Sequence, residues 1–233
     1  GLTPPPQPSA PAQSPPASSS GKWFRDPGVS RSLFAPTGFT LEHGERLLKV
    51  EAIYVAFELG IADHLSVELG TVYPGWLVGA INGEAGVKWG TDLNEQWHVA
   101  VSALAGGFPW SFTLGSGAMG LGTVTYGSRD ANVTCSAGAV MMGLASSKAS
   151  PVGEAALYYR LTQNLALETE HWFSYLRGPD PSFLMIHAGG VRLMFESVAI
   201  HAGAMSISTM ATSAPGATLS VWPWVGLTWL TTS

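Results

Sequence analysis

The stretch EAIYVAFELGIADHLSVEL, which runs from Glu51 to Leu69, decides how the rest of the chain is interpreted. Apolar residues occupy every second position on both sides of Asp63, at Ile53, Val55, Phe57, Leu59 and Ile61 and then at Leu65, Val67 and Leu69. A period of two residues is typical of a β-strand, because successive side chains point to opposite faces. The stretch therefore predicts two antiparallel strands joined by a tight turn near Asp63.

Four further polar turns divide the chain in the same way, at Asp92-Leu93-Asn94, Arg129-Asp130, Gln163-Asn164 and Glu196-Ser197. Alternating segments flank each turn, and longer connections rich in Gly, Pro and Ser separate one hairpin from the next. Short turns at one end of the strands and longer loops at the other are typical of a transmembrane β-barrel. We therefore predict an all-β, antiparallel, up-and-down transmembrane β-barrel.

The composition favours a membrane barrel over a soluble one. Only 12% of the residues are charged, against about 25% in a typical soluble domain. A water-facing exterior would need many more charges, so we expect the apolar face to meet lipid and the small and polar face to line the lumen. Two uncharged stretches, residues 96–128 and 197–233, are interrupted by Gly and Pro and do not read as membrane helices. The net charge of −5, without a basic run, argues against a nucleic-acid partner.

The turns set the number of strands. Eleven strands are expected at about residues 45–61, 64–74, 78–91, 95–106, 117–127, 131–143, 151–162, 164–176, 182–195, 197–206 and 219–231. Because short turns lie on the periplasmic side of such barrels, the strand at 45–61 needs one before it, and residues 32–39, within the stretch 31–44, are the candidate. We expect twelve strands, with ten as the alternative, and both termini in the periplasm.

The region before the barrel is rich in Pro and Ser. Such a composition cannot bury a core and stays extended. We therefore expect residues 1–30 to be a disordered periplasmic segment and residues 31–233 to form the barrel.

Isolated charges lie at positions that face the lumen by parity. This expected lumen charge network comprises Glu58, Glu68, Glu84, Lys88, His98, Glu154, Arg160, Glu168, Glu170, Arg192 and His201. Pairing about the turns sets Glu58 opposite Glu68, Lys88 opposite His98, and Arg192 opposite His201. Two interpretations remain open: the charges interlock as a polar filling of a narrow barrel, or they line a conducting path.

Aromatic residues lie near the expected strand ends. Trp89, Trp97 and Trp229 lie near one end, and Tyr73, Phe173 and Tyr175 near the other. Two aromatic bands are typical of the girdles at the interfaces of a membrane.

Three segments resemble recurring segments of small bacterial outer-membrane barrels of uncharacterised function. They are Phe34-Ala35-Pro36-Thr37-Gly38-Phe39, the segment from Leu59 to Ser66, and the segment from Tyr126 to Thr134. Because these motifs mark turns and strand ends, the resemblance implies a fold and a bacterial outer-membrane location, and it implies no chemistry.

The pattern as a whole points to a non-enzymatic protein. The six His residues show no metal-ligand spacing, and we expect no catalytic residue, metal or cofactor. We expect a structural or scaffold role in a cell-envelope assembly, with the lipid bilayer as one partner and envelope proteins bound through residues 1–30 or the loops. The alternative is a narrow porin-like channel for small solutes.

Overall fold

The computed structural model describes residues 23–51, 54–72, 83–107, 116–142, 148–177, 181–211 and 217–232. Within these ranges, no helix is long and apolar enough to cross a bilayer. The regular structure of the described residues consists of β-strands, whose bounds are β1 (Arg46–Glu51), β2 (Tyr54–Ala62), β3 (Leu65–Val72), β4 (Gly83–Asp92), β5 (Trp97–Gly107), β6 (Ser116–Gly127), β7 (Ala131–Met142), β8 (Ser150–Thr162), β9 (Leu165–Leu176), β10 (Ser182–Met194), β11 (Val198–Ala211) and β12 (Ala217–Thr231).

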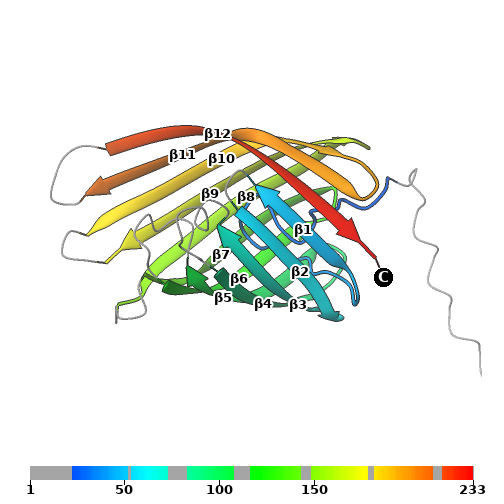
Figure 1. Ribbon diagram of the computed structural model, residues 1–233, viewed down its shortest axis with the longest axis horizontal. Coiled ribbons are helices and arrows are strands. Elements are labelled where there is room, and N and C mark those ends of the chain that lie inside the picture. Colours follow the sequence, from blue (N-terminus) through cyan, green and yellow to red (C-terminus); the bar gives the residue numbers. More distant parts are fainter. Residues whose placement is uncertain are drawn as a thin grey trace, which may run out of the picture.

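The twelve strands form a closed barrel in which each strand pairs with its neighbours in the sequence. All pairings are antiparallel, and β1 closes the barrel against β12 through the register Arg46 with Thr231 and Glu51 with Gly226. Figure 1 shows the tilted strands around the lumen, with β12 beside β1. The predicted all-β barrel of twelve strands is confirmed, and the alternative of ten strands is wrong.

The outer wall of the barrel is apolar. Large apolar side chains exposed there include Val50, Phe57, Leu69, Val87, Val101, Leu157, Leu167, Val191, Leu219, Val221 and Leu227. The alternate positions point inward and carry the buried polar and charged residues. In a closed barrel all strands pair with two neighbours, so no edge leaves backbone groups unpaired, and here an apolar band covers the outside. A bilayer requires both properties of a β-structure that spans it. The barrel is therefore a transmembrane one.

The first strand differs from the prediction. The stretch 45–61, predicted as one strand, is two antiparallel strands, β1 and β2, which pair from Arg46 with Leu59 to Glu51 with Tyr54. Residues 32–39, predicted as the extra strand, contribute only an isolated bridge between Arg31 and Pro36. Proline has no backbone N–H to donate to a strand ladder, so this stretch is unfavourable as a strand. The described residues of β1 and β2 include no proline, and each therefore has a backbone N–H that can donate.

Residues 24–41, which we call the plug loop, lie inside the barrel instead. Asp26, Ser30, Leu33 and Ala35 of this loop are at most 1% exposed. The loop starts near β8, where the Phe24 carbonyl accepts a hydrogen bond from Arg160, and it ends where Leu41 packs against β1 and β12. The domain boundary predicted at residue 30 therefore falls within one buried loop. Residues 1–22 lie outside the described residues, and their disorder stays a prediction.

Both ends of the plug loop lie at the barrel end that carries the short turns. Short turns join β2 to β3, β4 to β5, β6 to β7, β8 to β9 and β10 to β11. Arg46, at the start of β1, pairs with Thr231, at the end of β12, so the chain enters and leaves the barrel at this same end. The other end carries the remaining connections, whose residues lie largely outside the described ranges.

The close pairing of β6 and β7 yields a test of the barrel. A Cβ atom added to Gly138 would lie 1.9 Å from the Gly120 carbonyl oxygen, whereas one added to Gly122 would meet nothing closer than 3.8 Å. We expect Gly138→Ala to lower the free energy of unfolding by about 1–3 kcal/mol, because a backbone atom has to move. Gly122→Ala should leave it unchanged. The measurement is the temperature at which the folded, fast-migrating form on a detergent gel converts to the unfolded form. Absence of any such heat shift in the native protein would contradict the barrel itself.

Candidate functional site

The eleven residues of the predicted lumen charge network are all buried, at 7% exposure or less. They do not form one network. The structure divides them into separate groups, and most of these groups include a residue of the plug loop that was not among the predicted set.

The first group centres on Arg192 of β10. Its guanidinium lies 2.5 Å from the Asp26 carboxylate of the plug loop and 2.6 Å from the Glu168 carboxylate of β9. His201, which pairs with Arg192 across β10 and β11 as the turn predicted, lies 2.9 Å from Glu168. Because one buried cation contacts a carboxylate of the plug loop and a carboxylate of the wall, this group joins the plug loop to the wall through charge-assisted hydrogen bonds.

The second group centres on Arg31 of the plug loop. Glu58 and Glu68 pair across β2 and β3, as the turn at Asp63 predicted. Arg31 bridges the two, with an ion pair to Glu68 and its Nε 3.6 Å from Glu58. Ser30 of the plug loop also donates a hydrogen bond of 3.0 Å to Glu58. The facing carboxylates are therefore held by a cation that the register alone does not reveal.

The tip of the plug loop is bound through its backbone. The N–H groups of Phe34 and Ala35 donate to the Glu170 carboxylate of β9 at 2.9 and 3.2 Å. Glu170 also accepts a hydrogen bond from the indole N–H of Trp172. Lys49 of β1 donates to the Leu33 carbonyl, so an acid and a base hold the tip from two sides of the barrel.

Lys88 of β4 corrects a predicted pairing. It pairs with Ser102 across the sheet, and His98 pairs with Asp92. The prediction of Lys88 opposite His98 is wrong because the turn between β4 and β5 is longer than a two-residue hairpin and is centred on Glu95, two residues beyond Leu93. Lys88 instead donates to the plug-loop carbonyls of Ser30, at 2.6 Å, and Phe39.

Four remaining residues of the predicted set lie apart from these groups. His98 binds Asp92 at 2.5 Å, near the short-turn end, and Arg160 contacts Asp130 there and stacks over the Phe24 ring at 4.9 Å. Glu154 of β8 faces Ser136 and Trp172 across the neighbouring strands and forms no ion pair with a described residue. Glu84 lies beside Tyr54, whose hydroxyl is also 3.0 Å from Glu68.

The predicted girdle residues that the structure describes lie on the outer wall. Trp89, Trp97 and Trp229 are exposed near the short-turn end, and the Trp97 ring lies 4.8 Å from that of Tyr126. Phe173 is exposed on β9 and Tyr175 lies two residues further along that strand. Tyr73 lies outside the described residues. The assignment of these residues to membrane interfaces stays a prediction.

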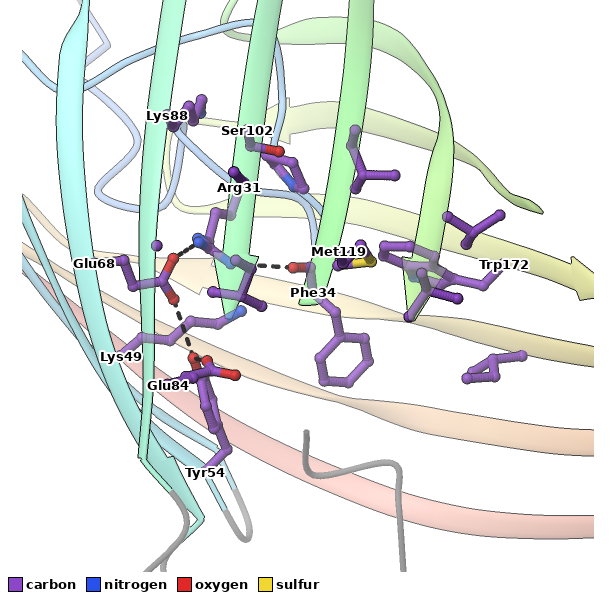
Figure 2. A pocket seen from close by; sticks show the side chains of 18 of the residues that line it. Arg31, Phe34, Lys49, Tyr54, Glu68, Glu84, Lys88, Ser102, Met119 and Trp172 are labelled. Atoms are coloured by element: carbon purple, nitrogen blue, oxygen red, sulfur yellow. Dashed lines mark hydrogen bonds and ion pairs between the residues drawn. The ribbon is translucent and has the colours of Figure 1, made fainter. Parts of the chain in front are cut away.

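A cavity of about 210 Å³ lies in the other half of the lumen, above the plug loop. Arg31, Phe34 and Pro36 of the plug loop contribute to its lining. One wall, formed by β1 to β4, carries charged and polar groups, which include Lys49, Glu51, Tyr54, Glu68 and Glu84. The opposite wall is mostly apolar. Its side chains include Leu104, Met119, Leu121, Val140, Val152, Trp172, Leu184, Ile186, Met205 and Trp224. Figure 2 shows the charged side chains gathered on one side of Phe34, with Met119 and Trp172 on the other.

Sequence reasoning missed Asp26, Arg31, Lys49, Glu51 and Tyr54. Asp26 was assigned to the segment before the barrel, and Arg31 to the start of the expected first strand. Lys49 and Glu51 fell in a strand whose facing was predicted with one parity throughout, and Tyr54, which has the lumen-facing parity, was left out because the expected network contained only charged residues and His. A signal was present: Lys49 and Glu51 are charged at odd positions, whereas Glu58 is charged at an even one. A change of the charged positions from odd to even numbers within one alternating run indicates that the run contains a hairpin.

Within the described residues, no group of three or more His, Cys, Asp and Glu side chains is arranged to hold a metal ion. His171 and His187, on the outer wall, form a pair at 2.9 Å across β9 and β10. The lumen groups consist of ion pairs and of hydrogen bonds to backbone. This arrangement can hold a loop in place and can bind a solute.

Solved structures with a similar barrel include the NanC porin, with a TM-score of 0.56 and 7% identity over 79% of this chain and 98% of that chain. The barrel has a porin fold. The KdgM porin (TM-score 0.48, 8% identity, 79% of this chain and 96% of that chain) and the outer-membrane expressed OmpT of Vibrio cholerae (TM-score 0.45, 13% identity, 90% of this chain and 75% of that chain) are more distant in structure. At 7% identity the likeness concerns the fold alone. No protein-family model matches the chain, and no curated protein matches it.

The Arg192 group gives a prediction about stability. Arg192→Met removes the cation between Asp26 and Glu168 and leaves two buried carboxylates together. Breaking a buried ion pair in this way costs about 3–5 kcal/mol, so we expect a decrease of that size in the free energy of unfolding, measured by urea denaturation in lipid vesicles.

Two variants serve as controls for this prediction. Arg46→Met changes an exposed arginine that has no ion pair among the described residues, and it should have little effect. Adding Asp26→Asn and Glu168→Gln to Arg192→Met should restore part of the loss. An unchanged stability of Arg192→Met would contradict the importance of this group.

Proposed function

We propose that this chain is a narrow outer-membrane channel that its own plug loop closes. The observation that carries the proposal is that a separate loop occupies one half of the lumen, entering and leaving at one end of the barrel. A lumen filled only by side chains of the strands cannot open without unfolding the barrel. A loop held by hydrogen bonds and ion pairs can leave while the strand ladder stays intact.

The orientation follows from the turns. Short turns lie on the periplasmic side of bacterial outer-membrane barrels, so the plug loop would enter from the periplasm and both barrel ends of the chain would lie there. The apolar outer wall and the porin fold support this location. Residues 1–22 would then precede the plug loop on the periplasmic side.

The second candidate is a permanently closed scaffold in an envelope assembly. The buried Arg192 group favours it, because separating Arg192 from Asp26 is costly when both are inside the barrel. In that case envelope proteins would bind the loops or the region before the plug loop. We place no catalytic step in either function, and neither requires a metal or a cofactor.

Planar-bilayer recordings test the channel directly. We expect rare openings from the native protein and at least tenfold more time in the open state from Glu170→Ala, because the Phe34 and Ala35 N–H groups lose their acceptor. The matched control is Glu196→Ala, an exposed glutamate in the turn between β10 and β11, which should behave as the native protein.

A crosslinked variant distinguishes openings that require movement of the plug loop from current that passes while the loop stays in place. Ser30 and Ser66 both donate to the Glu58 carboxylate, one from the plug loop and one from β3. In a Cys135→Ser background, Ser30→Cys and Ser66→Cys joined by a short thiol crosslinker should abolish openings, and cleavage of the crosslinker should restore them. Openings that persist in the crosslinked form, or a silent Glu170→Ala variant that still shows the heat shift, would reject the channel and favour the scaffold.

A further inference from the structure

The cavity above the plug loop contains polar groups that the described residues leave unsatisfied. Glu51 of β1 is 6% exposed and lines the cavity; its Oε1 faces Lys49 at 2.8 Å, while its Oε2 has no hydrogen bond or ion pair with a described residue. The indole Nε1 of Trp224, 7% exposed and in the same lining, likewise has no described acceptor. A buried polar atom without a partner costs free energy, so both atoms favour an occupant.

These two side chains lie close together. Glu51 pairs with Gly226 across β1 and β12, and a Cβ atom added to Gly226 would lie 3.1 Å from the Glu51 Cγ and 3.5 Å from the Trp224 ring. Gly226 therefore leaves space between the Glu51 side chain and the Cζ3 edge of the indole. The Nε1 atom lies on the other side of the ring, toward β11, where a Cβ atom added to Gly203 would lie 2.8 Å from it. The acceptor and the donor without partners therefore mark two separate positions in the lining.

The charges of the cavity favour a cation. Its lining contains the cations Arg31, Lys49 and Lys88 and the carboxylates Glu51, Glu58, Glu68 and Glu84, one more carboxylate than cation. The cations are already engaged: Arg31 binds Glu58 and Glu68, Lys49 binds Glu51 Oε1 and the Leu33 carbonyl, and Lys88 binds carbonyls of the plug loop. Glu84 forms no ion pair with a described residue. An added ammonium group would gain attraction from carboxylates, whereas an added anion would not.

The opposite wall supplies an apolar surface. Met119, Val152, Ile186 and Met205 line it together with the aromatic ring of Trp172. An apolar wall that faces a few polar groups is the usual character of a small-molecule site. Its volume of about 210 Å³ is below the range of drug-sized pockets, about 300–1,000 Å³, so a small ligand fits it better.

We infer that this cavity binds a small amphipathic amine, with its ammonium group at Glu51 and Glu84 and its apolar part against the Met119 and Trp172 wall. Aromatic faces such as Phe34 and Trp172 add attraction for a cation. A hydroxyl or carbonyl on the ligand would satisfy the Trp224 N–H. The inference rests on the cavity and holds whether or not the barrel conducts.

Three compounds of similar shape and different charge test this site on the full chain in lipid nanodiscs. They are 2-phenylethylamine, 2-phenylethanol and 3-phenylpropionate, and binding is measured by calorimetry against empty nanodiscs. We expect saturable binding of the amine at least tenfold tighter than that of the alcohol, and weaker binding still of the carboxylate. Equal affinities for the amine and the alcohol, or binding of none of the three, would overturn the inference.

Glu51→Gln locates the site, because it keeps the shape of the side chain and removes its charge. A hydrogen bond to a charged group contributes about 1.5–3 kcal/mol, and 1.4 kcal/mol is a factor of about ten, so the amine should bind at least tenfold more weakly while the alcohol is unaffected. Glu84→Gln should act in the same direction, and exposed Glu196→Gln should have no effect. Unchanged amine affinity in both cavity variants, each verified by the heat shift, would refute the assignment. Because no current is measured, this result is separate from the outcome of the bilayer recordings.

Discussion

The structure depends on the closure of the strand ladder. In a bilayer there is no water to bind free backbone groups, so the strands must pair all round and leave no edge. Closure between β1 and β12 meets this demand. It also creates a lumen with a polar inner face, because the alternate side chains that do not face lipid must point inward. That inner face contains carboxylates and cations that need partners.

At one end of the barrel, the plug loop supplies partners for these buried carboxylates and cations. Its Arg31 supplies a cation to the wall carboxylates Glu58 and Glu68, its Asp26 binds Arg192, and its backbone satisfies Glu170, Lys49 and Lys88. The wall and the loop are thus complementary in charge and in hydrogen bonding. Toward the other end, the described residues leave a cavity with polar atoms that they do not satisfy. One lumen therefore combines a closed half with a half suited to a ligand.

The fold could be predicted because its signals are local. A strand in this barrel has lipid on one side and the lumen on the other, so the period of two persists at every strand, and the turns at Asp63, Asp130 and Asn164 mark the hairpins. The register of the strands near these turns could also be predicted from the sequence, which is why the pairs Glu58 with Glu68 and Arg192 with His201 were predicted correctly. The hairpin between β1 and β2 carries no Gly, Pro or Asn in residues 51–54, and it was missed for that reason.

The sequence by itself determined the class of structure and the membrane setting, because alternation and turn chemistry act over a few residues. The total of twelve strands was also predicted, but with a first strand at residues 32–39 in place of the division between β1 and β2. The tertiary structure alone decided the path of residues 24–41 and the partners of the lumen charges. Those contacts join positions far apart in the chain, such as Asp26 with Arg192, and no local pattern encodes them. The same holds for the cavity, whose acidic and apolar walls come from opposite sides of the closed barrel and face each other only after β12 has paired with β1.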